Sequence, residues 1–133
     1  MNQARILVVD DNPTNLKLAC DVLEFDGYDV LAASDAEAAL EIIKAGPLDL
    51  ILMDIALPGM DGLTLTRQLK ADERTWHIII VALTAFAMKG DDNKAREAGC
   101  DGYITKPIDT RNLSSAVASY LSASRGEPKG SQE

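Results

Sequence analysis

The sequence LILMDIALPG at residues 50–59 decides the fold of this chain. Four apolar residues lead directly into Asp54, and Pro58-Gly59 ends the run. A short, unbroken apolar run is typical of a strand that is covered on both faces, as in a parallel sheet. Asp54 would then stand at the carboxyl end of its strand, where open α/β sheets bind ligands. An aspartate beside a Pro-Gly turn is also common, so this segment alone leaves a purely structural role open.

Length, composition and charge restrict the class of protein. The 133 residues fit one domain, and a hydrophobic content of 47% is enough for a packed core. The net charge of −8 disfavours nucleic acid or an anionic membrane as the main partner, and it suits carboxylates that surround a cation. We find no signal-peptide pattern, and the apolar run at residues 78–88 is far shorter than the ~20 residues of a membrane helix. These features predict a soluble, cytoplasmic protein without a membrane partner.

The two cysteines, Cys20 and Cys100, lie far apart in the sequence. Neither has a second cysteine at CxxC spacing, which disfavours a zinc site or a redox motif. We therefore expect two reduced and mostly buried thiols, as in a cytosolic protein.

Strand and helix patterns alternate along the rest of the chain. Asp11 or Asn12 can cap the first helix, and Ser34-Asp35-Ala36-Glu37 matches a capping box for the second. The helix at residues 88–98 has a thin apolar face, which predicts a loosely held element. Hydrophobic periodicity predicts strands at 4–9, 28–33, a run ending at 54, 78–83 and 102–105, and helices at 13–25, from 36 to the Gly46-Pro47 stop, 61–71, 88–98 and after Asp109.

Five successive strand–helix units predict an α/β fold, a flavodoxin-like (βα)5 doubly wound parallel sheet with strand order 2-1-3-4-5. In that order the first and third strands are neighbours, so Asp10 and Asp11 lie next to Asp54. Thr84 ends the fourth strand and Lys106 follows the fifth. All five polar residues are therefore expected at one edge of the sheet.

Three carboxylates gathered at one place require compensation. Each pair of charges costs about 1 kcal/mol in water and ~4 kcal/mol near a protein surface. Oxygen ligands without histidine or cysteine favour Mg²⁺ over zinc. Asp54 then becomes a candidate nucleophile for phosphoryl transfer, with the Thr84 hydroxyl and the Lys106 ammonium available to neutralise and position the transferred group. Taken one at a time, these residues also have purely structural explanations. Asp11 could be only a helix cap, Thr84 could be a hydroxyl at the end of a strand, and Lys106 could be a surface lysine.

Four motifs resemble the receiver domain of two-component signalling, in the chemotaxis-type class of single-domain response regulators. They are VVDDN at 8–12, LMDIALPGMDG at 52–62, LTA at 83–85 and GYITKP at 102–107. The run TAFAMKGD at 84–91 is also similar to DivK-type cell-cycle regulators and to receivers fused to hybrid histidine kinases. The resemblance implies a receiver domain at residues 1–124, and we expect the Gly-, Ser- and charge-containing segment 125–133 to be a disordered tail.

This resemblance implies that Asp54 accepts a phosphoryl group from a phosphohistidine on a histidine kinase or histidine phosphotransferase. It implies that Asp11, Asp54 and the backbone carbonyl of Ala56 bind Mg²⁺. Asp10 would assist through a water molecule. The chain would not be an enzyme beyond its own phosphorylation and slow dephosphorylation.

The resemblance also assigns the switch and its output. Thr84 and Lys106 would bind the phosphoryl oxygens, and Tyr103 would turn inward as Thr84 moves toward the phosphate. Lys106-Pro107 would be a cis peptide. The phosphorylated form would offer helix 88–98, strand 102–105 and the last helix to a protein target rather than to DNA.

Two residues in or next to the motifs that resemble the family suggest slow loss of the phosphate from Asp54. Ala56 and Phe86 stand two residues after Asp54 and Thr84, where the family borders the path of the hydrolytic water. A small and a large apolar side chain there would leave that water poorly held.

Three other interpretations fit parts of the sequence. A haloacid dehalogenase-type enzyme needs a second aspartate at the position of Ala56. A flavin binder needs a hydroxyl-rich phosphate loop where the chain has Asp10-Asp11-Asn12-Pro13. A receiver cut from a larger hybrid kinase remains compatible with the sequence.

Overall fold

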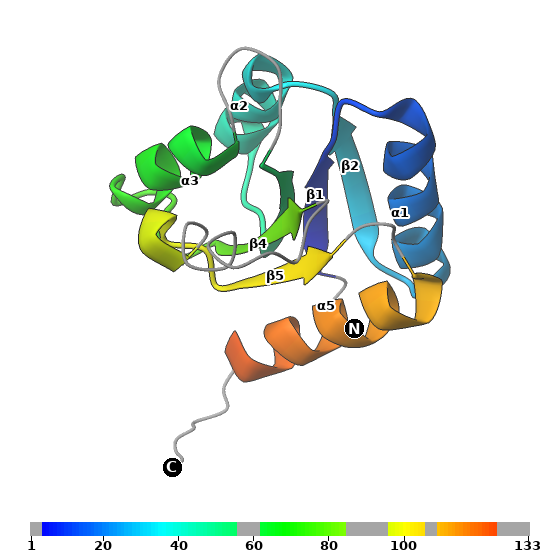
Figure 1. Ribbon diagram of the computed structural model, residues 1–133. Coiled ribbons are helices and arrows are strands. Elements are labelled where there is room, and N and C mark those ends of the chain that lie inside the picture. The colour runs from blue at the N-terminus through cyan, green and yellow to red at the C-terminus, as the bar shows by residue number, and fades with distance from the viewer. Residues whose placement is uncertain (1–3, 56–61, 85–95, 106–108, 125–133) are drawn as a thin grey trace.

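The computed structural model describes residues 4–55, 62–84, 96–105 and 109–124 (Figure 1). Residues 96–98 are helical, and the rest of the predicted helix 88–98 lies outside the described residues. The strands are β1 (Arg5–Val9), β2 (Asp29–Ala33), β3 (Leu50–Asp54), β4 (Ile79–Thr84) and β5 (Gly102–Thr105), and the helices are α1 (Pro13–Phe25), α2 (Ala36–Ala45), α3 (Gly62–Lys70) and α5 (Thr110–Ser124).

The strands form one parallel sheet in the order β2-β1-β3-β4-β5, which confirms the predicted flavodoxin-like fold. Val9, at the end of β1, is in register with Ala33 of β2 and Met53 of β3. Asp54 is in register with Leu83, so Thr84 lies one position beyond it on β4. This register brings the carboxyl ends of β1, β3 and β4 to one edge of the sheet.

Two hydrophobic clusters cover the two faces of the sheet. Helices α1 and α5 pack on one face, and α2 and α3 pack on the other (Figure 1). Successive residues of β1 alternate between these clusters, with Ile6 and Val8 in the first and Leu7 and Val9 in the second. Because both faces are covered, every residue of β3 and of β4 is buried, as their unbroken apolar runs predicted.

Local capping residues set where the first two helices begin. The Asn12 side chain accepts hydrogen bonds from the N–H groups of Thr14 at 2.9 Å and Asn15 at 3.1 Å, so Asn12 caps α1. Asp35 caps α2 by accepting from the N–H of Ala38 at 2.8 Å. The predicted capping box that started at Ser34 is therefore wrong, because the helix begins one residue later.

A lysine joins the end of α3 to the segment that leads into β5. The ammonium of Lys70 donates to the carbonyls of Trp76 at 3.0 Å and Ile78 at 2.7 Å, and it pairs with the carboxylate of Asp101 at 3.0 Å. The same Asp101 oxygen accepts the N–H of Ile80 at 2.8 Å. These contacts fix the amino-terminal ends of β4 and β5 against α3.

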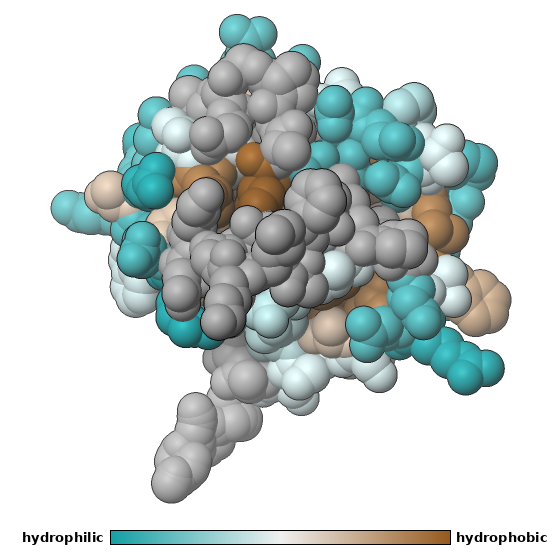
Figure 2. Space-filling model, in the orientation of Figure 1, coloured by the Kyte–Doolittle hydropathy of each residue, from teal (hydrophilic) through white to brown (hydrophobic). Residues whose placement is uncertain are grey.

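The surface is largely polar. On the face in Figure 2, hydrophilic residues cover most of the coloured surface and apolar residues lie in small patches between them. The large apolar side chains that are exposed, within the described residues, are Phe25 at 91%, Trp76 at 59% and Tyr103 at 42%. No helix in the described part of the chain is long and apolar enough to cross a membrane.

Candidate functional site

Asp10 and Asp11 follow directly after β1. The N–H of Asp10 donates to the carbonyl of Ala33 at 3.1 Å, so strand pairing continues one residue past Val9. The Asp10 carboxylate is fully buried and accepts the N–H of Asn12 at 2.9 Å. Asp11 is exposed. Because Asn12 caps α1, the alternative in which Asp11 is only a helix cap is wrong.

Asp54 is the last residue of β3 and only 3% exposed. The next N–H, of Ile55, donates to the carbonyl of Leu83 at 3.2 Å, so the sheet holds the backbone on the far side of Asp54 as well. Gly62, the first residue of α3, packs against this backbone. A Cβ atom at Gly62 would lie 2.2 Å from the carbonyl oxygen of Asp54, which only glycine avoids. This contact could not be predicted from the sequence, since the glycine alone does not show what lies against it.

The three carboxylates meet as predicted. Each of Asp10, Asp11 and Asp54 offers one oxygen, and these three oxygens lie within 4.8 Å of one another. Oxygen ligands of one Mg²⁺ lie about 3.0 Å apart when adjacent and about 4.2 Å apart when opposite, because each is about 2.1 Å from the ion. The limit of 4.8 Å is only slightly longer than the separation of opposite ligands. The all-oxygen donor set and its spacing fit a hard divalent cation.

The other predicted site residues are only partly described. Thr84 ends β4, is 4% exposed and is in register with Thr105 of β5. Thr105 immediately precedes Lys106 in the sequence. Lys106 and Ala56 lie outside the described residues, as does the predicted cis peptide. Tyr103 lies on β5 with its side chain 42% exposed.

The cysteines stand apart from this cluster. Cys20 and Cys100 are both free and partly buried, so they are less enclosed than the sequence suggested. Burial raises the pKa of the Cys20 thiol and that of the Cys100 thiol. The Cys100 sulfur lies 4.0 Å from the hydroxyl of Thr66, which itself donates to the carbonyl of Gly62 at 2.8 Å. Both thiols are therefore poor nucleophiles near neutral pH.

Comparison with known proteins identifies the family. The family model of the response regulator receiver domain matches residues 6–118. The chain belongs to this family. It is 43% identical over 116 residues to the polar-differentiation response regulator DivK of Brucella ovis, a match that covers 87% of this chain and 94% of that protein. Response regulator receiver domains belong to two-component systems, which is the class of function predicted from the motifs.

Solved structures share the fold over nearly their whole length. A response regulator from Chloroflexus aurantiacus superposes with a TM-score of 0.87 at 31% identity, covering 91% of this chain and 99% of that one. The receiver domain of a sensor histidine kinase from Pseudomonas aeruginosa superposes with a TM-score of 0.82 at 33% identity, covering 90% and 98%. That receiver was solved with a magnesium ion coordinated in its active site cleft.

Proposed function

We propose that Asp54 is the phosphoryl acceptor of this receiver domain and that a histidine kinase or histidine phosphotransferase is the donor. The observation that carries this proposal is the position of Asp54. It is a buried carboxylate at the end of a central strand, with oxygens of Asp10 and Asp11 within 4.8 Å. Such a cluster is costly for folding alone and suits a group that receives charge-neutralising ligands.

The transfer requires little from the protein beyond charge and position. A carboxylate oxygen of Asp54 attacks the phosphorus of the phosphohistidine, a P–O bond forms and the P–N bond to the imidazole breaks. Asp11, Asp54 and the carbonyl of Ala56 would hold Mg²⁺, with Asp10 reached through a water molecule. When bound, the ion supplies positive charge next to the oxygens of the transferred group.

The remaining contacts would come from β4 and from the segment after β5. Thr84 lies one position past Leu83, the residue paired with Asp54, and its hydroxyl would donate to a phosphoryl oxygen on Asp54. Lys106 follows Thr105, the partner of Thr84, and its ammonium would take a second oxygen. Tyr103 is partly exposed on β5 and would turn inward as Thr84 moves toward the phosphoryl group.

The output would be a protein-binding surface made of helix 88–98, β5 and α5. The net charge of −8 disfavours DNA as the target. Together with the absence of a membrane-spanning helix among the described residues, it is consistent with the cytoplasm as the place of action. We expect no turnover of a separate substrate, only phosphorylation of Asp54 and its slow reversal.

The test is the mass of the intact protein after incubation with Mg²⁺ and a small acyl phosphate. We expect one hydroxylamine-labile phosphoryl adduct that disappears with EDTA or in Asp54→Asn. Glu41→Gln removes an exposed carboxylate of α2 and should leave the adduct unchanged. Where the small donor gives no adduct, a phosphorylated histidine kinase replaces it. Failure with both donors, or an adduct that persists in Asp54→Asn, would refute the proposal.

Slow loss of the phosphate is the second part of the proposal. Phe86→Glu and Ala56→Asn each introduce a polar side chain at a position that, by the resemblance to the family, would border the path of the hydrolytic water. We expect a shorter half-life of the phosphorylated protein in each variant, measured by loss of the adduct over time. Half-lives equal to wild type in both variants would show that these side chains do not limit hydrolysis.

A further inference from the structure

Thr66 is a buried polar residue that the proposed phosphorylation site does not use. Within the described part of the chain, the buried polar or charged residues are Asp10, Asp54, Thr66 and Thr84. Three of these four belong to the proposed site, and Thr66, on α3, is the fourth. Burying a hydroxyl costs free energy that valine, an apolar side chain of the same shape, would avoid. The Thr66 hydroxyl therefore needs an explanation.

The Thr66 hydroxyl holds the first residue of α3. It donates to the carbonyl oxygen of Gly62 at 2.8 Å, four residues earlier in the helix. Regular helix bonding directs the N–H of Thr66 at the same oxygen, so two donors of one residue hold this carbonyl. A threonine that bonds back in this way slightly bends its helix, and here it acts on the first turn of α3.

Gly62 is in direct contact with the backbone of the proposed phosphoryl acceptor. A Cβ atom at Gly62 would overlap the carbonyl oxygen of Asp54 and would lie 2.9 Å from the Cα atom of Ile55. The N–H of Ile55 in turn donates to the carbonyl of Leu83 on β4 at 3.2 Å. The backbone of Asp54 is thus confined between β4 and Gly62. A shift of the first turn of α3 would therefore displace Asp54.

The Thr66 hydroxyl also accepts a weak hydrogen bond. The thiol sulfur of Cys100 lies 4.0 Å from the Thr66 oxygen. The next residue, Asp101, is fixed to β4, because its N–H donates to the carbonyl of Ile80 at 2.7 Å and its carboxylate accepts the N–H of Ile80 at 2.8 Å. Because the thiol donates to the hydroxyl oxygen, the single hydroxyl proton is directed to Gly62.

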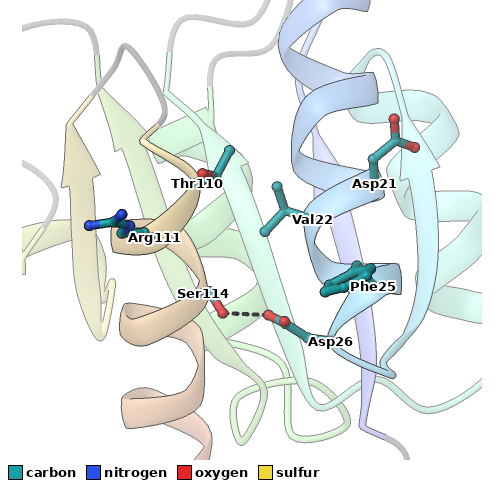
Figure 3. Close-up of a pocket in the computed structure, with 7 residues that line it drawn as sticks. All are labelled: Asp21, Val22, Phe25, Asp26, Thr110, Arg111 and Ser114. Atoms are coloured by element: carbon teal, nitrogen blue, oxygen red, sulfur yellow. Dashed lines mark hydrogen bonds between the residues drawn. The ribbon is translucent and has the colours of Figure 1, made fainter.

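Two other hydroxyls provide a comparison. Thr75 donates to the carbonyl of Leu69 at 2.6 Å, near the last residue of α3. Ser114 donates to the carboxylate of Asp26 at 2.5 Å, just past the end of α1 and beside a surface groove (Figure 3). Both hydroxyl residues are only partly buried. In each case the accepting group lies at the end of its helix opposite the acidic cluster.

We propose that Thr66 is a positioning residue for phosphoryl transfer. Through Gly62, its hydroxyl holds Asp54 where the three carboxylates of the cluster meet, with oxygens within 4.8 Å of one another. The first turn of α3 also follows the segment that carries Ala56, the residue whose carbonyl is expected to bind Mg²⁺. This inference rests on the proposed function of Asp54. It predicts that the hydroxyl affects Mg²⁺ affinity and transfer as well as folding.

The test compares Thr66→Val, which loses the donor, with Thr66→Ser, which keeps it. Calorimetry gives the Mg²⁺ affinity of the unphosphorylated full chain, and the mass of the intact protein gives the rate of phosphorylation by acetyl phosphate at saturating Mg²⁺. Thr66→Val should bind Mg²⁺ about 10-fold more weakly and gain the phosphoryl group about 10-fold more slowly, since small displacements of reacting groups have effects of this size. Thr66→Ser should restore both values.

The controls remove other hydrogen bonds. Thr75→Val and Ser114→Ala should leave Mg²⁺ affinity and phosphorylation rate unchanged. Cys100→Ala keeps the bond from Thr66 to Gly62 and should also leave both unchanged. Urea denaturation of each variant measures stability separately, because a purely structural hydroxyl would change the midpoint of Thr66→Val and neither of the other two values. Thr66→Ala takes the place of Thr66→Val if the valine variant does not fold.

Three results would overturn the inference. Folded Thr66→Val could keep the Mg²⁺ affinity and rate of wild type, Thr66→Ser could fail to restore them, or a control variant could lose as much as Thr66→Val does. An equal loss in Cys100→Ala would mean that the hydroxyl acts through Cys100 instead of Gly62. Absence of a phosphoryl group on wild-type Asp54 would refute the proposed function, and the Mg²⁺ affinities would still decide the role of Thr66.

Discussion

Replacing Asp54 by asparagine should stabilise the protein in the absence of divalent cations. The substitution keeps the shape of the side chain and removes one of the three charges gathered at the carboxyl edge of the sheet. It is a sharp test of the site because a residue kept only for stability would have the opposite effect.

The magnitude follows from the geometry of the cluster. At the upper limit of 4.8 Å, two unit charges repel by about 0.9 kcal/mol in water and about 3.5 kcal/mol at an effective dielectric constant of 20. Asp10 is buried and Asp11 is exposed. The larger energy therefore applies to the repulsion between Asp10 and Asp54, and the smaller energy to the repulsion between Asp11 and Asp54. Asparagine also gives up the favourable contacts of the carboxylate, so we expect a net gain of about 1–3 kcal/mol.

The assay is urea denaturation followed by circular dichroism in low salt with EDTA, and then with Mg²⁺. Mg²⁺ should raise the unfolding free energy of wild type and have little effect on Asp54→Asn, because binding to the native state alone stabilises it. Glu41→Gln makes the same change in net charge outside the cluster and should change stability by less than about 0.5 kcal/mol. A destabilised Asp54→Asn, or a gain no larger than that of Glu41→Gln, would refute the account of the cluster.

Three further predictions concern the backbone contact of Gly62, the Lys70–Asp101 pair and the Cys100 thiol. Gly62→Ala places a Cβ against the Asp54 carbonyl and should cost about 1–3 kcal/mol in urea denaturation; an unchanged midpoint would contradict the contact. Asp101→Ala removes the partner of Lys70 and should cost about 1–3 kcal/mol, and a loss below about 0.5 kcal/mol would mean that this pair does not hold α3. The raised pKa of Cys100 keeps its thiol protonated at pH 8, so iodoacetamide should alkylate Cys100 more slowly than it alkylates glutathione. The rate at Cys100 should increase as the pH rises. Equal alkylation rates for Cys100 and glutathione at pH 8 would show that Cys100 is a thiolate.

The fold could be predicted because its elements carry their own local signals. The apolar runs that became β3 and β4 are buried along their whole length, and α1 has the predicted bounds of residues 13–25. Pro13 begins that helix, and Gly27, with a φ of 96°, follows its end. Convergence of Asp10, Asp11 and Asp54 then follows from the strand order alone, since parallel strands end at the same edge.

Contacts between residues distant in the sequence could not be predicted. Nothing local shows that Gly62 meets the backbone of Asp54, or that Lys70 reaches Asp101 thirty-one residues later. The cap of α2 was misplaced by one residue because Ser34 and Asp35 are both good caps, and the choice depends on how the chain leaves β2. The predictions for Ala56, Lys106 and most of helix 88–98 fall outside the described residues.

β1 is an interior strand of the sheet, so the gene for this protein should be sensitive to inserted or deleted codons within that strand. Each residue of β1 is held by β2 on one side and, from Ile6 onward, by β3 on the other. Deleting a single codon within β1 would exchange the side chains facing the two cores, sending Ile6 and Val8 where Leu7 and Val9 belong. It would also draw Asp10 into the strand and away from Asp54. Codon losses and gains should therefore be poorly tolerated within β1.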